Sequence, residues 1–241
     1  MFKKVLIVLS FVGFTFATLD ANQLLDTVDS YRGYSERFAI DMYIIDYKGD
    51  TVKAENGMIV YVKDRRSSYV QYTSPAVDKD KMLLMVGENM WFYRKNLQKP
   101  VPITQRQRLL GNASNADVAR ANFSEDYKPT IIASSVAVDD KKTIQLELRA
   151  KNDGAAYGKI ILWLDEVSYK PLKGEFYAIS EKLLKTVNYK SFKLYNGEEK
   201  IAELDICDAI TKENKTTLKY KNYTKKIVPD YYFNVDYLPR L

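Results

Sequence analysis

The side chains most able to do chemistry in this chain are paired carboxylates and one thiol. Asp139 with Asp140, and Glu198 with Glu199, could act as an acid and a base, since hydrolases often use two carboxyl groups. Both pairs fall in predicted turns, where solvated acidic residues are common. Cys207 is the only cysteine and the chain has no histidine, which removes the usual zinc and thiol catalytic sets.

No other catalytic pattern accompanies these residues. The sequence contains no glycine-rich phosphate loop, no Gly-x-Ser-x-Gly turn and no metal-ligand spacing. We therefore expect no enzymatic activity, no cofactor and no metal. A carboxylate pair assembled from distant strands remains open, and strongly shifted carboxylate pKa values inside a cavity would favour it.

The charge balance argues against a nucleic acid partner. The formal net charge is only +6 at pH 7, and the charges are scattered in mixed clusters that are typical of a solvated β surface. Lys225, Lys226 and Arg240 give the C-terminus a basic character that would allow weak, transient contact with anionic membranes. Simple solubility explains the same surplus.

The N-terminus predicts export. Lys3 and Lys4 precede an apolar stretch at residues 5–16, which is too short for a bilayer core that needs roughly 20 residues. We predict a signal peptide over residues 1–21, cleaved after Ala17 or Ala21, and a periplasmic location. A retained membrane anchor is the alternative. No linker follows, so residues 22–241 are expected to form one domain.

Helical spacing appears at the start of the mature chain. Leu24, Leu25 and Val28 share one face of an expected amphipathic helix over residues 22–34. Two-residue alternation then dominates, and Gly87 with Glu88 predicts a tight hairpin. The expected strands are residues 37–47, 53–63, 66–72, 81–86, 89–95, 130–138, 143–149, 159–164, 172–179, 184–194, 200–210 and 216–223.

The alternation breaks between residues 100 and 127. Residues 114–121 predict a short helix, with Ser114 as its N-cap and Asp117 at the third position, where both satisfy free N–H groups. A long excursion from a sheet is often a lid or a binding loop. An ordinary capped connector explains the same pattern equally well.

No helix long enough for a parallel crossover is predicted between these strands, so the sheet should be antiparallel. A wide antiparallel sheet must curl, and its concave apolar face must meet a helix, a second sheet or a ligand. Methionines and aromatic residues are frequent on these strands, and methionine adapts to variable apolar partners. They are Phe38, Met42, Met58, Met82, Met85, Met90, Trp91, Tyr93, Trp163 and Phe176.

The middle of the chain resembles the outer-membrane lipoprotein-sorting protein family, the LolA-like group. In that group a Trp-x-Tyr strand is followed by a basic segment, a small-residue turn and a short acidic helix. One departure is Asn112, which follows Gly111 in a turn where small residues are expected. The matching residues are Met90, Trp91, Phe92, Tyr93, Pro102, Ile103, Gln105, Arg106, Arg108, Gly111, Ala113, Ser114, Asp117, Asp126 and Tyr127.

The resemblance implies a strongly curved antiparallel sheet that forms an incomplete β-barrel under a helical lid. It also implies a carrier that shields the acyl chains of lipoproteins or lipids on the way to the outer membrane. An inner-membrane exporter and an outer-membrane acceptor would be its partners. The alternatives are an envelope scaffold with a packed core and, with less support, an integral outer-membrane barrel, whose lipid-facing band the charged strand residues would interrupt.

We expect six residues to bind the ligand and seven to form the lid or rim. The ligand-binding residues are Phe38, Met42, Met58, Trp91, Tyr93 and Trp163. The lid or rim residues are Leu24, Leu25, Val28, Arg106, Arg108, Ser114 and Asp117. Strand parity groups residues by face, but it does not identify the concave face.

Overall fold

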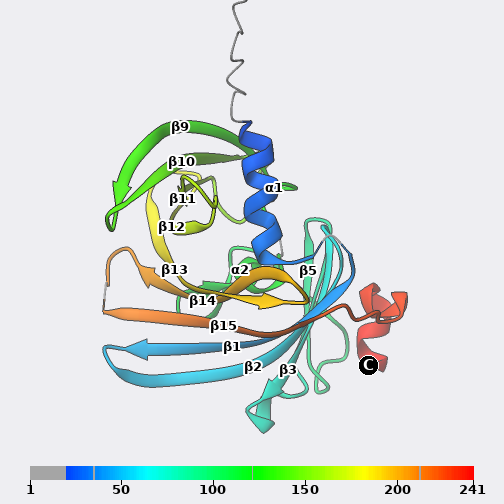
Figure 1. Ribbon diagram of the computed structural model, residues 1–241. Coiled ribbons are helices and arrows are strands. Elements are labelled where there is room, and N and C mark those ends of the chain that lie inside the picture. The colour runs from blue at the N-terminus through cyan, green and yellow to red at the C-terminus, as the bar shows by residue number, and fades with distance from the viewer. Residues whose placement is uncertain (1–19, 35, 121, 212) are drawn as a thin grey trace, which may run out of the picture.

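One curled antiparallel sheet organises the molecule. The computed structural model describes residues 20–34, 36–120, 122–211 and 213–241. Within these residues, thirteen strands form one sheet in the order β6-β5-β4-β3-β2-β1-β15-β14-β13-β12-β11-β10-β9. The strands form two meanders, β1 to β6 and β9 to β15, which join where β1 pairs with β15. The sheet bends round a hollow that contains α2, with α1 across its opening (Figure 1).

The elements follow the alternation of the sequence closely. The helices are α1 (Ala21–Arg32) and α2 (Asn115–Ala119), with 3-10 turns η1 (Ala76–Asp78), η2 (Asp230–Phe233) and η3 (Val235–Arg240). The strands are β1 (Phe38–Lys48), β2 (Thr51–Asp64), β3 (Ser67–Ser74), β4 (Met82–Val86), β5 (Asn89–Tyr93), β6 (Val101–Ile103), β7 (Arg108–Leu110), β8 (Ala113–Ser114), β9 (Tyr127–Val138), β10 (Lys141–Ala150), β11 (Lys159–Asp165), β12 (Pro171–Tyr177), β13 (Leu183–Tyr195), β14 (Glu198–Asp208) and β15 (Asn214–Thr224).

The strand register gathers one set of alternating residues on the concave face. Met42 of β1 lies opposite Met58 of β2 and Tyr220 of β15. Phe38 lies opposite Val62 in the same way. These side chains belong to the larger of two apolar clusters, which also contains the inward residues of β10 to β14. The concave face is therefore mainly apolar along the bend.

The two edges of the sheet explain why the hollow is filled. β6 and β9 are the two edge strands of the thirteen-stranded sheet. Along the chain, β9 is the next strand of that sheet after β6. The segment that connects them, residues 104–126, must therefore cross the opening between the edges. It forms the two-stranded β7-β8 ribbon and α2, and it packs into the concave cluster through Ala116, Val118 and Phe123. We call the described residues of this segment, 104–120 and 122–126, the plug.

α1 provides the second cover of the concave face. Asp20 caps it by accepting a hydrogen bond from the Asn22 N–H at 2.9 Å. Leu24, Leu25 and Val28 are buried in the concave cluster. α1 lies across the ends of β9 and β14. No helix in the described part of the chain is long and apolar enough to span a membrane.

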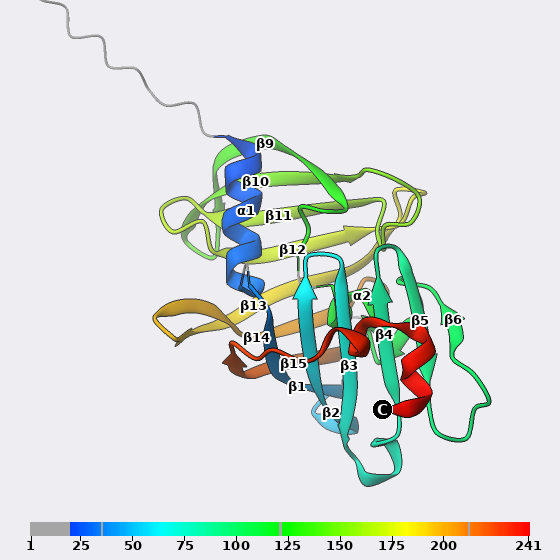
Figure 2. The same ribbon diagram turned by 90° about the vertical axis from the view of Figure 1, so that its right-hand side faces the viewer.

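The convex face carries a separate aromatic cluster on β1 to β5. Tyr61, Tyr69 and Leu84 are buried there under the C-terminal residues 228–241, which we call the tail. Figure 2 shows the tail lying over β3, β4 and β5, on the side of the sheet away from α1. Phe233 and Leu238 of the tail are buried in this cluster.

The predicted fold class is confirmed, since the chain is mainly β with one large open antiparallel sheet. All twelve predicted strands are present, as are the hairpin at Gly87 and the helix before β1. The short strands β6, β7 and β8 were missed because they lie in the segment without alternation. Residues 1–19 of the predicted signal peptide fall outside the described residues, so the signal and its cleavage site stay predictions.

Candidate functional site

The predicted cap at Ser114 is confirmed, and it aims a carboxylate into the hollow. The Ser114 N–H donates to the Asp117 carboxylate at 2.7 Å, and the Asp117 N–H donates to the Ser114 hydroxyl at 3.4 Å, which completes a capping box. The Tyr157 hydroxyl donates to the other carboxylate oxygen of Asp117 at 2.8 Å. The short helix thus fixes Asp117 at the centre of the plug.

Asp117 forms a buried ion pair with Lys185 of β13. Lys185 is only 5% exposed, and it occupies an inward position in the same alternation as Val187 and Tyr189. Burial lowers the pKa of Lys185, which the Asp117 carboxylate partly offsets. Burial raises the pKa of Asp117, but the Lys185 charge and hydrogen bonds outweigh it and hold that pKa below its ordinary value.

Arg32 links α1 to the plug. It donates to the carbonyl of Arg120 at 2.9 Å, and its guanidinium lies 4.1 Å from the centre of the Phe123 ring. Asp29, one turn earlier on α1, accepts hydrogen bonds from the N–H groups of Phe123 at 2.7 Å and Ser124 at 2.9 Å. The two covers of the concave face are therefore fastened to each other.

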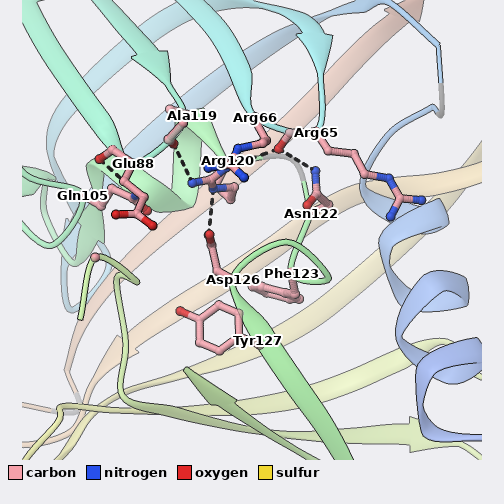
Figure 3. Close-up of polar contacts among 12 residues, drawn as sticks. Arg65, Arg66, Glu88, Gln105, Ala119, Arg120, Asn122, Phe123, Asp126 and Tyr127 are labelled. Atoms are coloured by element: carbon pink, nitrogen blue, oxygen red, sulfur yellow. Dashed lines mark hydrogen bonds and ion pairs between the residues drawn. The ribbon is translucent and has the colours of Figure 1, made fainter. Parts of the chain in front are cut away.

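Arg120 fastens the plug to the turns of the sheet, as Figure 3 shows. Its guanidinium donates to the carbonyl of Arg65 at 3.2 Å and to that of Gly87 at 3.0 Å. Its Nε lies 2.8 Å from the Asp126 carboxylate. Arg120 and Asp126 are 4% and 6% exposed, so this ion pair is buried. Burial raises the pKa of Asp126, and the Arg120 charge opposes that rise.

The other end of the plug is fixed at the far side of the hollow. The Asn112 N–H donates to the Thr216 hydroxyl at 2.8 Å, and its amide donates to the Asn214 carbonyl at 2.9 Å. Gly111 has a φ of +54°, and an added Cβ would collide with Asp46 and Thr216. The asparagine that departs from the expected small-residue turn thus anchors the ribbon tip to β15.

Little free space remains inside. A cavity of about 30 Å³ lies between the plug and the sheet, and a second of about 20 Å³ adjoins it. Arg32, Asp117, Arg120 and Tyr220 line both cavities. Sites for small ligands usually measure about 300–1,000 Å³. In this conformation these two cavities have no room for an acyl chain.

A larger hollow of about 630 Å³ lies outside, where β5 and β6 meet the start of the plug. Trp91, Pro102 and Ile103 give it an apolar wall, and Arg106 lies at its rim. The side chain of Gln105 lines both this hollow and the inner cavity of about 30 Å³. Among the described residues no group of three or more acidic or cysteine side chains is arranged to hold a metal ion.

Comparison with known proteins identifies the fold. A family model described as "Uncharacterized protein" matches residues 64–240. No curated protein matches the chain. The crystal structure of a LolA superfamily protein from Nitrosomonas europaea is 30% identical, with a TM-score of 0.85, over 91% of this chain and 100% of that chain.

The chain belongs to the LolA superfamily.

Two more distant structures share the fold of this LolA superfamily protein. A DUF1329 family protein from Desulfovibrio piger has a TM-score of 0.76 at 15% identity, over 90% of this chain and 97% of that chain. An outer membrane lipoprotein-sorting protein domain from Vibrio parahaemolyticus has a TM-score of 0.74 at 18% identity, over 92% of this chain and 100% of that chain.

Three of the six expected ligand-binding residues lie on the concave face of the LolA sheet. Phe38, Met42 and Met58 are buried in the concave cluster. Trp91 and Tyr93 instead belong to the convex cluster, because Met90 and Phe92 occupy the inward positions of β5.

Trp163 is a further correction. Its neighbours Leu162 and Leu164 point inward, so the Trp163 side chain lies on the other face of the sheet. There the Lys173 ammonium is 4.6 Å from the centre of the Trp163 ring. The expectation that Trp91, Tyr93 and Trp163 line the interior is therefore corrected. All three were placed by residue type without a known concave face.

The expected lid and rim residues are only partly brought together. Leu24, Leu25 and Val28 on α1, and Ser114 and Asp117 in the plug, all cover the concave face. Arg106 and Arg108 do not form a basic rim beside these residues.

Arg106 donates to the carbonyls of Ala155 at 3.0 Å and Asp153 at 2.5 Å, so its guanidinium ties the plug to the β10-β11 connection. Arg108 on β7 is exposed.

The charged residues that hold the interior together were not predicted from the sequence. Arg120 and Lys185 are buried and Arg32 is half-buried. For Lys185 a signal existed, since a lysine at an inward position of an alternating strand must find a partner. Arg32 and Arg120 lie at the ends of short helices, where no periodicity marks a residue as buried.

Proposed function

We propose that this protein is a periplasmic carrier that binds acyl chains of lipoproteins or lipids and moves them toward the outer membrane. The observation that carries the proposal is the nature of the cover. A curved apolar sheet is closed by a short segment that is held by buried charged contacts as well as by apolar packing, where a permanent core would be closed by a second sheet or by well-packed helices.

The energetics favour exchange of the plug for a ligand. An acyl chain of roughly 16 carbons gains on the order of 12 kcal/mol on leaving water, at about 0.8 kcal/mol per methylene. Each polar contact of the plug contributes only about 1 kcal/mol net, because water replaces it when the plug leaves. The gain from an acyl chain can therefore compete both with these polar contacts and with the apolar contacts of Ala116, Val118 and Phe123.

The plug also retains buried polar atoms that a permanent core would satisfy. The side-chain oxygens of Gln105 and Asn122 are buried and have no hydrogen-bond partner among the described residues. Such atoms are rare in native interiors and call for a functional explanation. We attribute them to a segment that moves between a closed and an open position, each of which satisfies a different set of polar groups.

Transfer requires two states that differ in affinity, since a ligand held equally well in both would not be handed over. In our proposal an inner-membrane exporter supplies the acyl chain as the plug opens. An outer-membrane acceptor receives the chain as the plug closes and returns the cavity to about 30 Å³. The contact with each membrane is transient.

The small interior favours a second candidate, a non-catalytic envelope scaffold. A scaffold should be packed at normal density, and the closed interior is nearly full. In a scaffold the plug would be permanent core and would not exchange. Uptake of an apolar ligand by the folded protein separates the two functions.

Native mass spectrometry of the protein purified from its own envelope provides the test. A carrier should retain a lipid or an acylated polypeptide, which extraction then identifies. After removal of the lipid, the folded protein should bind the fluorescent apolar probe N-phenyl-1-naphthylamine at one saturable site. Full folding with no copurified lipid and no saturable probe binding would contradict the carrier and leave the scaffold.

A further inference from the structure

The interior contains more charge than an acyl chain alone requires. Lys185 is buried above the rings of Tyr157 and Phe176, with its ammonium 4.8 Å and 5.6 Å from their centres. Both rings line the inner cavity, as does Arg32. A cavity for hydrocarbon alone would have apolar walls throughout, because isolated buried charges are costly. These cations therefore indicate something about the ligand.

The anion that neutralises Lys185 belongs to the movable part. Asp117 lies in the plug, whereas Lys185 lies on β13 and Tyr157 lies in the connection between β10 and β11. If the plug leaves, the carboxylate leaves with it and the ammonium stays in the sheet. Removing one partner of a buried pair leaves an uncompensated charge, which is strongly unfavourable. The open state needs a replacement anion.

We propose that Lys185 and the Tyr157 hydroxyl bind an anionic group of the ligand, a carboxylate or a phosphate joined to an acyl chain, at the position that Asp117 occupies in the closed state. The inference rests on the proposed carrier function and narrows its ligand to anionic amphiphiles. Asp117 then acts as an internal competitor that fills the anion site until the ligand arrives. Arg32, which lines the same cavity, adds positive charge beside the site.

The geometry suits a compact oxyanion. One carboxylate oxygen of Asp117 accepts a hydrogen bond from the Tyr157 hydroxyl. The other oxygen accepts hydrogen bonds from the Lys185 ammonium and the Ser114 N–H. The sheet supplies the ammonium and the hydroxyl after Ser114 has moved away with the plug. Charge-assisted hydrogen bonds of this kind are stronger than neutral ones. The site should therefore discriminate by charge, while the strand face accepts the chain.

The first test compares ligands that share a chain and differ in the head. The assay measures how well hexadecanoate, hexadecyl phosphate and hexadecanol each displace N-phenyl-1-naphthylamine from the delipidated protein. We expect the two anions to bind at least tenfold more tightly than the alcohol. A preference for only one of the anions identifies the source of the negative charge and supports the site. Equal affinity for all three overturns the anion site and leaves the carrier function intact.

Binding of none of these ligands, with no saturable probe binding, overturns the carrier function and this inference with it. The two failures are therefore distinguishable. A solution in which each ligand remains monomeric is required, because aggregates of the anions would distort the comparison.

The second test removes the internal competitor. Asp117→Asn preserves the size of the side chain and removes its charge, which leaves Lys185 unpaired in the closed state. The affinity for hexadecanoate should therefore rise about tenfold, and the preference for hexadecanoate over hexadecanol should persist. Asp80→Asn is the matched control, because it removes the same charge from an ion pair with Arg94 on the outer surface. Equal gains in the two variants, or no gain in Asp117→Asn, contradict the proposal.

The third variant removes the whole pair and guards against loss of folding. Lys185→Met with Asp117→Asn leaves no buried charge unpaired, and such replacements are often tolerated. The folded double variant should bind hexadecanol as the wild type does and should lose its preference for hexadecanoate. A preference that persists in this variant would overturn the assignment to Lys185.

Discussion

The sheet has two apolar faces, and each is covered by a segment that lies outside the thirteen-stranded sheet, but the two covers are held differently. The plug is fastened to the sheet by Arg120, which donates to backbone carbonyls, and by Asp117, which pairs with the buried Lys185. The tail is fastened by packing, with Leu238 fully buried and the Tyr232 ring edge-on to Tyr69 at 5.4 Å, and its ion pairs with Arg37 and Lys63 are formed by the exposed Asp230. Both covers pack apolar side chains against the sheet, but the charged contacts are buried under the plug and exposed at the tail.

This difference indicates which of the two covers can move. Water compensates for polar contacts when a segment detaches, so their net contribution is small. Buried apolar area has no such substitute, so its loss has the full cost. We interpret the tail as a permanent part of the structure and the plug as the part that exchanges with a ligand.

The largest effect is expected at the tail. Leu238→Ala should lower the free energy of unfolding by about 2–5 kcal/mol, because it leaves a cavity in a packed cluster. Thermal denaturation should show a drop of roughly 5–15 °C for a chain of this size. Probe binding per folded molecule should be unchanged. The control is Leu194→Ala, whose side chain is exposed and should have little effect.

The second effect concerns the plug. Arg120→Met leaves the buried Asp126 without its cation and two carbonyls without their donor, which destabilises the closed state by about 3 kcal/mol. Binding of N-phenyl-1-naphthylamine should then become at least tenfold tighter. Arg94→Met, which breaks a surface pair with Asp80, is the matched control. A variant with a lower melting temperature and unchanged probe affinity would make the plug permanent core, like the tail.

A smaller effect is expected from pH. Burial raises the pKa of Asp126 in the closed plug, and the charges facing it are Arg120, Arg66, Glu125 and Glu88. The closed state therefore binds a proton more readily than an open state in which Asp126 is solvated, so acid favours closure. Probe affinity should therefore weaken as pH falls toward 3.8, the ordinary pKa of an aspartate. The pKa of Asp117 is lowered, so its opposite contribution begins only below its ordinary value of 3.8.

Arg120→Met combined with Asp126→Asn should abolish this dependence, because the titrating group is gone. An affinity that weakens equally in that variant would assign the effect to other groups. Buried Asp29, whose pKa burial also raises, is the next candidate.

The smallest effect is expected at Trp91. It lies on the convex side of β5, in the cluster that the tail covers and beside the outer hollow. Trp91→Ala should therefore change the affinity for an apolar probe less than twofold. Met58→Ala, which shortens a buried side chain on the concave face, is the comparison and should change it more. A strong loss in Trp91→Ala would move the ligand site to the outer hollow.

The sequence predicted most of the fold because the sheet depends on local alternation. The strands around Met42 and Met58, and the capping box of Ser114 and Asp117, follow from neighbouring residues alone. The resemblance to the LolA-like group supplied the curvature and the lid. Neither the alternation nor the resemblance identified which face of the sheet is concave, so Trp91 was predicted on the wrong face.

The candidate site depends on contacts that are distant in the chain. Lys185 meets Asp117 across 68 positions, and Arg32 meets Arg120 across 88. No local pattern encodes these pairs, because each depends on how the plug crosses between the edge strands. The tail was missed for the same reason, since its short turns are buried only where the convex face of β3 to β5 receives them.

Hydrogen exchange of the folded protein, with and without hexadecanoate, tests the central claim most directly. The amides of Phe123 and Ser124, which donate to Asp29 when the plug is closed, should exchange faster with ligand bound. The amide of Leu241 in the tail, which donates to the Leu238 carbonyl, should be unaffected. Plug amides that remain as protected as before, while the ligand is bound, would contradict exchange of the plug for the ligand.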